Sequence, residues 1–97
     1  MKYGLKDSYL QNIIHTLQEY KEIKEAFIFG SRAKGNYQDS SDIDIALKGD
    51  INLKLIAKLK AVFEESNIPY FVDIVSYENA PLGLKESIDK NSKAIKL

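Results

Sequence analysis

The sequence predicts a single α/β (α+β) domain spanning residues 1–97, in which short strands alternate with helices. Ninety-seven residues, of which 44% are hydrophobic and 29% charged, are enough for one modest core and too few for two. Two kinds of apolar periodicity follow one another along the chain, one typical of amphipathic helices and the other of short strands. The expected order is helix, strand, helical turn, strand, helix, strand, helix, or αβ(α)βαβα.

The first third of the chain predicts a helix and a buried strand. A helix is expected near residues 8–21, because Ser8 and Gln11 have the form of a capping box and apolar residues then recur at helical spacing. The aromatic run over residues 25–29 suits a buried strand, which is expected to end at Gly30.

The middle of the chain predicts a helical turn, a second strand and a longer helix. Residues 31–35 are expected to form the turn, and residues 42–47 the strand, because carboxylates there alternate with apolar side chains. Asp50 is expected to cap the next helix, which ends near residue 66. The recurring positions of this helix are three or four residues apart: Leu53, Ile56, Leu59, Lys60 and Phe63.

The last third predicts a third strand and a final helix. Residues 70–75 form a β-branched and aromatic run just after Pro69, so they are expected to be a strand. Pro81 is suited to the first turn of the last helix, which carries Leu84 and Ile88. No further strand is predicted beyond this helix.

Charge and composition narrow the classes of partner. Fourteen basic and fourteen acidic residues cancel, so the chain lacks the positive charge that general nucleic-acid binding requires. The absence of cysteine, of a long apolar run and of a secretory leader predicts a cytoplasmic protein without disulfides or a membrane span. The sequence leaves open whether the chain forms a homo-oligomer.

Three aspartates are the candidate catalytic residues. Asp42 and Asp44 are two residues apart on a strand and share one face, with Cα atoms roughly 7 Å apart. Asp73 alternates with apolar neighbours in the third strand. Such carboxylates would repel one another, whereas Mg²⁺ would neutralise them. Two ions would suit phosphoryl-type transfer, with Asp42 and Asp44 bridging both and Asp73 holding the ion at the acceptor hydroxyl. Taken alone, an Asp-x-Asp pair is more often an exposed strand edge.

A glycine-containing turn precedes these acids. Gly30 lets the backbone turn and approach a phosphate closely, and Ser31 offers a hydroxyl. Arg32, the single arginine, is expected to contact a triphosphate, and Lys34 could add a second charge. The structural alternative is an ordinary strand-to-helix turn with Ser31 as its cap. Tyr37 could touch a base, although most tyrosines of this chain suit a core or boundary position.

The two motifs together resemble the signature of the DNA polymerase β nucleotidyltransferase superfamily. They are Gly30-Ser31-Arg32-Ala33-Lys34-Gly35 and Ser41-Asp42-Ile43-Asp44-Ile45. The chain is most similar to the minimal nucleotidyltransferases, or MNT proteins, of HEPN/MNT toxin–antitoxin pairs. Because Asp73 falls where that family carries its third acid, the resemblance covers essentially the whole chain.

The resemblance implies a fold, a reaction and a partner. The implied fold is a small mixed β-sheet flanked by helices. The implied site has magnesium at Asp42, Asp44 and Asp73 and nucleotide contacts at Gly30 and Ser31. The implied reaction uses ATP or another nucleoside triphosphate and, in some members, transfers AMP to a tyrosine of a helical HEPN toxin, which silences the toxin.

Two other functions remain consistent with the sequence. The chain could neutralise a HEPN-type ribonuclease by binding alone, since it lacks the additional domain with which larger relatives hold a base or a template. Transfer of a nucleotide to a small molecule such as an aminoglycoside is a third interpretation, weakened by the absence of a second domain to form the acceptor pocket. The motifs do not identify the acceptor or the donor base.

Overall fold

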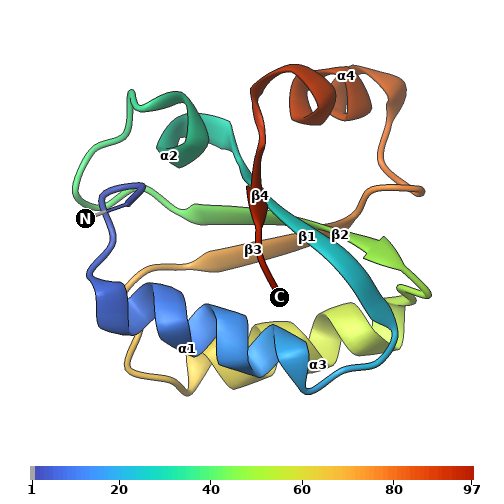
Figure 1. Ribbon diagram of the computed structural model, residues 1–97, viewed down its shortest axis with the longest axis horizontal. Coiled ribbons are helices and arrows are strands. Elements are labelled where there is room, and N and C mark those ends of the chain that lie inside the picture. The colour runs from blue at the N-terminus through green and yellow to red at the C-terminus, as the bar shows by residue number, and fades with distance from the viewer. Residues whose placement is uncertain (1) are drawn as a thin grey trace.

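The computed structural model describes residues 2–97 and contains one four-stranded sheet between two layers of helices (Figure 1). This architecture confirms the predicted α/β class with a small mixed sheet flanked by helices, and it adds a fourth strand. The elements in chain order are α1 (Asp7–Gln18), β1 (Ile23–Phe29), α2 (Gly30–Lys34), β2 (Ile43–Gly49), α3 (Leu53–Glu64), β3 (Val72–Ser76), α4 (Leu82–Asn91) and β4 (Lys93–Ile95).

The sheet has the strand order β3-β2-β1-β4. β1 is antiparallel to both β2 and β4, whereas β2 and β3 are parallel. A parallel pair needs a crossover connection, and α3 provides it. β2 is therefore paired on both sides, and its first residues lie between the end of β1 and the start of β3.

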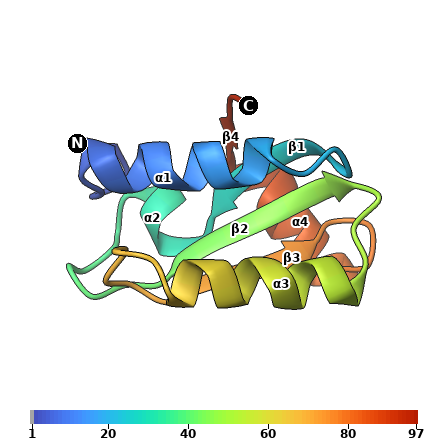
Figure 2. The same ribbon diagram turned by 90° about the horizontal axis from the view of Figure 1, so that it is seen from below.

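Alternation along β2 sends its side chains to two different layers. Ile43, Ile45 and Leu47 are fully buried and belong to the core formed with α1 and α3, which lie side by side on one face (Figure 2). Ala46 packs instead in a smaller cluster with residues of α4, on the face that α2 and α4 cover. A one-residue slip would exchange the two sets, so burial of the larger apolar set fixes the register. Asp44 consequently faces the α2 and α4 layer.

The observed helix starts differ from two predicted ones. α1 begins at Asp7, so Ser8 lies within its first turn and forms no capping box. α3 is capped by Asn52, whose Oδ1 accepts a hydrogen bond of 2.8 Å from the Leu55 N–H, and not by Asp50. Asn and Asp are similarly good caps, so the length of the preceding strand decides between them. Within residues 2–97, no helix has the length and apolar character needed to cross a bilayer.

The segment after α4 forms β4, which the sequence analysis did not predict. Lys93–Ile95 pair antiparallel with Ala26–Ile28 of β1. Only Ile95 of this strand is buried, so three residues carry almost no periodic signal. The free edge of β1 supplies the hydrogen bonds that make the segment a strand.

Candidate active site

Three aspartates lie where the two parallel strands β2 and β3 begin, and we call this region the acidic rim. Asp44 on β2 and Asp73 on β3 are direct register partners, so their side chains leave the same face of strands that lie about 5 Å apart. Asp42 precedes β2 by one residue. The next residue, Ile43, donates its N–H to the Phe71 carbonyl at 2.9 Å, which fixes the start of β2 against the start of β3.

Asp44 has the environment least favourable to a charged carboxylate. Its pKa is raised from 3.8 to about 6, first because burial removes water and then because of the negative charges of Asp73 and Asp42. Asp42 is exposed, and Asp73 pairs with Lys60 of α3, with 3.4 Å between Nζ and Oδ1. Among residues 2–97, no three acidic, histidine or cysteine side chains are close enough to form a ready metal-binding group. Of the three acids, Asp44 is thus the one whose surroundings disfavour its negative charge.

Gly30 lies directly against Asp44. The last residue of β1, Phe29, is the register partner of Asp44, and Gly30 follows with a φ of +72°. A Cβ at Gly30 would overlap the Asp44 Oδ2 atom. Glycine is thus required here both by the backbone conformation and by the close approach of the carboxylate. Ser31 comes next and is half-buried at the start of α2.

Replacing Gly30 by Ala is expected to destabilise the protein more than replacing Gly35 by Ala. Gly35 also has a left-handed φ, +88°, but an added Cβ there would have no neighbour within 4 Å. Gly35→Ala should therefore cost about 1 kcal/mol of backbone strain. Gly30→Ala should cost about 1 to 3 kcal/mol more, because it also crowds Asp44. Urea unfolding of both variants measures the difference, and equal losses would show that the contact with Asp44 is unimportant.

Arg32 does not reach the acidic rim, contrary to the phosphate contact expected for it. Its side chain is 2% exposed. The guanidinium carbon lies 4.5 Å from the centroid of the Tyr70 ring and 5.3 Å from that of Tyr37. Its N–H groups donate to the backbone carbonyls of Tyr3 at 2.9 Å, Asp39 at 3.3 Å and Ser41 at 2.8 and 3.0 Å. Three of these four hydrogen bonds hold the loop that leads into β2, and the fourth holds the backbone at Tyr3.

That loop is closed by Ser41, the residue before Asp42. The Ser41 hydroxyl accepts a hydrogen bond of 2.8 Å from the Gln38 N–H, and the Ser41 N–H donates to the Gln38 carbonyl at 3.0 Å. With its carbonyl held by Arg32, Ser41 fixes the backbone from which Asp42 extends. The motifs single out Arg32 and Ser41, but their positioning role has no sequence signature, because the acceptors are backbone carbonyls.

The raised pKa of Asp44 predicts how metal-free stability depends on pH. Between pH 3.8 and about 6 the folded protein binds more protons at Asp44 than the unfolded chain does, so this residue's contribution to stability falls as pH rises. Asp44→Asn removes that dependence. In EDTA, the variant is expected to gain stability relative to the parent protein as pH rises from 4 to 7. Denaturation midpoints across this range test it, and a difference independent of pH would contradict the assignment.

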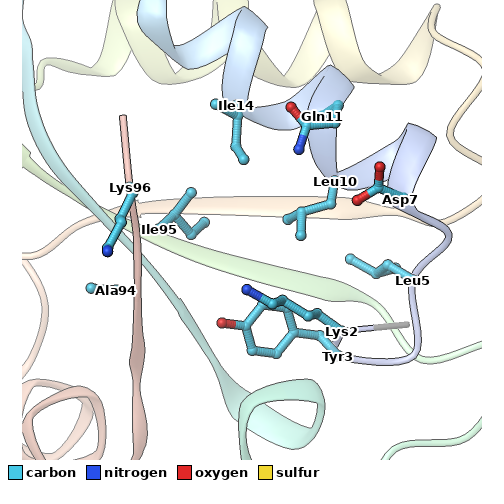
Figure 3. A pocket seen from close by; sticks show the side chains of 10 residues that line it. All are labelled: Lys2, Tyr3, Leu5, Asp7, Leu10, Gln11, Ile14, Ala94, Ile95 and Lys96. Atoms are coloured by element: carbon cyan, nitrogen blue, oxygen red, sulfur yellow. The ribbon is translucent and has the colours of Figure 1, made fainter.

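A cavity of about 490 Å³ lies away from the acidic rim. It is bordered by the N-terminal segment, α1 and β4, and Leu10, Ile14 and Ile95 line it (Figure 3). A second groove, of about 280 Å³, runs beside β3 and α3 and includes Lys60, the partner of Asp73. None of the three aspartates lines either space, and Lys60 links Asp73 to the smaller groove.

Comparison with known proteins identifies the family of the chain. Residues 11–96 match the family model described as "Polymerase beta, Nucleotidyltransferase". The chain is 31% identical over 88 residues to the Haemophilus influenzae protein named "Probable protein adenylyltransferase MntA", and the alignment covers 89% of this chain and 77% of that protein. The match confirms the resemblance that the two motifs carry.

Solved structures share the fold. One is described as "the toxin-antitoxin with AMP-PNP", with a TM-score of 0.67 and 25% identity over 88% of this chain and 70% of its own. Another contains tri-AMPylated Shewanella oneidensis HEPN toxin in complex with MNT antitoxin, with a TM-score of 0.59 and 22% identity over 92% of this chain and 71% of its own. With the family model, which spans most of the sequence, these similarities place the chain in the polymerase β nucleotidyltransferase family.

Proposed function

We propose that this nucleotidyltransferase is a protein adenylyltransferase, which moves AMP from ATP to a hydroxyl of a HEPN-type helical partner and so acts as the antitoxin of a pair. The observation that carries the proposal is the register of Asp44 and Asp73 on adjacent parallel strands, with Asp42 just before Asp44. The Haemophilus influenzae relative is named as a protein adenylyltransferase, and a structural neighbour is described with AMP-PNP. These names support AMP as the transferred group.

The acidic rim suits magnesium. Its donors are carboxylate oxygens, the ligands that Mg²⁺ prefers, and a bound cation would offset the burial and the carboxylate repulsion that raise the pKa of Asp44. Asp42, Asp44 and Asp73 would hold the ion or ions. Because Mg²⁺ typically keeps several waters and uses substrate phosphates as ligands, the site does not need a closed group of three protein ligands. When bound, Mg²⁺ would neutralise charge that develops on the phosphate oxygens.

The proposed reaction is a single displacement at the α-phosphorus of ATP. The acceptor oxygen bonds to this phosphorus, the bond to the oxygen bridging the α- and β-phosphates breaks, and pyrophosphate leaves. Asp73 takes the proton of the acceptor hydroxyl. Gly30 allows the triphosphate to approach the backbone, and Ser31 offers a hydroxyl to it. Arg32 positions the loop before Asp42 and is left out of this contact set.

The proposal is tested by incubating the purified chain with Mg²⁺ and α-labelled ATP, with and without a purified HEPN-type partner. Label is expected on the partner, removable by phosphodiesterase, and intact-mass spectrometry should show added AMP. Parallel reactions with labelled GTP, CTP and UTP identify the donor base. Absence of label with every donor, while the partner binds the chain, would overturn the transferase assignment.

A non-catalytic antitoxin is the second candidate. Three large apolar side chains on different elements are strongly exposed: Leu53 at 83%, Leu82 at 73% and Phe71 at 61%. A protein partner that covered these side chains would bury apolar surface, which favours association. Under this alternative, a variant carrying Asp42→Asn and Asp44→Asn would still protect cells from the partner. Loss of protection, with binding retained, would favour catalysis.

A further inference from the structure

Lys60 is a cation that reaches the acidic rim from the opposite layer. It belongs to α3, whose buried residues pack on the face of the sheet away from Asp44, yet its Nζ lies 3.4 Å from Asp73 Oδ1. β3 is an edge strand, so a long side chain can pass around it. Lys60 also follows the apolar spacing of α3 and lines the groove beside β3 together with Ile56. Lys60 therefore brings a positive charge from α3 to the acidic rim.

The ion pair between Lys60 and Asp73 is weak enough for a metal ion to replace the lysine at Asp73. The two side chains are 40% and 38% exposed, and ion pairs this exposed stabilise proteins only weakly. The same Asp73 charge acts on Asp44, whose pKa it helps to raise. The lysine therefore supplies positive charge at Asp73, whereas burial and the two neighbouring carboxylates act on Asp44.

We propose that Lys60 is a positioning residue that holds the Asp73 carboxylate when no divalent cation is bound and competes with that cation for it. This inference rests on the proposed function. Lys60 would hold the Asp73 carboxylate in one orientation. A divalent cation that binds Asp73 would first have to break this weak ion pair. The concentration of divalent cation needed to occupy the acidic rim would therefore depend on Lys60, which lies outside both sequence motifs.

The test compares Lys60→Met and Lys60→Gln with Lys60→Arg, which keeps the charge. Lys54→Met is the matched control, because Lys54 is exposed on the same helix and its loss changes the net charge equally. Mn²⁺ binding is followed by the paramagnetic resonance of free Mn²⁺, with and without an ATP analogue carrying a methylene bridge between the α- and β-phosphates. Circular dichroism confirms that each variant is folded.

The neutral variants are expected to bind Mn²⁺ about two- to five-fold more tightly, because a weak competitor is gone. Lys60→Arg and Lys54→Met should remain close to the parent protein. In an Asp73→Asn background, Lys60→Met should lose its effect. In transfer assays, the neutral variants should reach half-maximal rate at correspondingly lower Mg²⁺ with an unchanged maximal rate.

Three outcomes separate this inference from the proposed function. Unchanged Mn²⁺ binding in both neutral variants, or an equal shift in Lys54→Met, overturns the role of Lys60 even if the parent protein transfers AMP. No Mn²⁺ binding by the parent protein, with or without the analogue, also overturns it. The expected binding shift in a protein that transfers no nucleotide supports Lys60 as a competitor and refutes the transferase.

Discussion

Replacing Asp44 by Asn is expected to lower the rate of AMP transfer by about a thousand-fold while leaving the protein folded. Metal-assisted charge stabilisation is worth several kcal/mol, and each factor of ten in rate corresponds to about 1.4 kcal/mol. Asp44 lies between Gly30 and Asp73 and is the most buried acid of the proposed metal site. Asn has nearly the same shape but lacks the negative charge that would bind the metal. Single-turnover transfer to the partner measures the change.

Stability distinguishes loss of chemistry from loss of structure in this variant. Because the pKa of Asp44 is raised to about 6, the charged carboxylate opposes folding at neutral pH, and the Asn variant should be at least as stable as its parent there. Asp50→Asn is the matched control, since Asp50 is exposed just beyond the other end of β2. It should leave transfer unchanged. A less stable Asp44→Asn protein, or one that retains transfer, would contradict the assignment of Asp44 to the catalytic centre.

The parts of the fold that the sequence predicted are those with a repeated pattern. Alternation in β2 and helical spacing in α1 and α3 each involve several residues that report on the same buried face. β4 has three residues and one buried side chain, so its conformation depends on pairing with β1 and not on its own composition. Helix caps were misplaced for a related reason, because the end of the preceding strand selects between Asp50 and Asn52.

In the candidate site too, the sequence predicts the features that follow a repeated pattern and misses those that depend on tertiary contacts. Alternation places Asp44 and Asp73 on one face without any knowledge of tertiary structure, and the motif spacing points to Gly30. Sequence cannot show the direction of a long side chain. The motif spacing predicts a phosphate contact for Arg32, whereas its guanidinium turns toward backbone carbonyls. Helical spacing places Lys60 among the apolar residues of α3, whereas its side chain reaches Asp73. A single cation in an otherwise apolar helical row was the signal available for Lys60.

Replacing Arg32 by Met is expected to lower the free energy of unfolding by about 3 to 5 kcal/mol, because a buried charged group leaves its hydrogen-bond acceptors unpaired. Folded domains are typically stable by about 5 to 15 kcal/mol, so this loss would be a large fraction of the total. Arg32→Lys should rescue little. An ammonium cannot reproduce the planar fork that reaches Tyr3 and Ser41 or stack on the ring of Tyr70.

Lys34→Met is the control for this prediction, since Lys34 is exposed on the same short helix and should change stability by less than about 0.5 kcal/mol. Urea unfolding and binding of an ATP analogue together separate two roles for Arg32. If it clamps the loop, Arg32→Met loses stability, and the folded fraction binds nucleotide less well because Asp42 follows the loosened Ser41. If Arg32 instead contacted the triphosphate, the variant would unfold normally and lose only nucleotide affinity. The buried guanidinium favours the first outcome. Its four hydrogen bonds are made to backbone carbonyls and hold it away from the acidic rim.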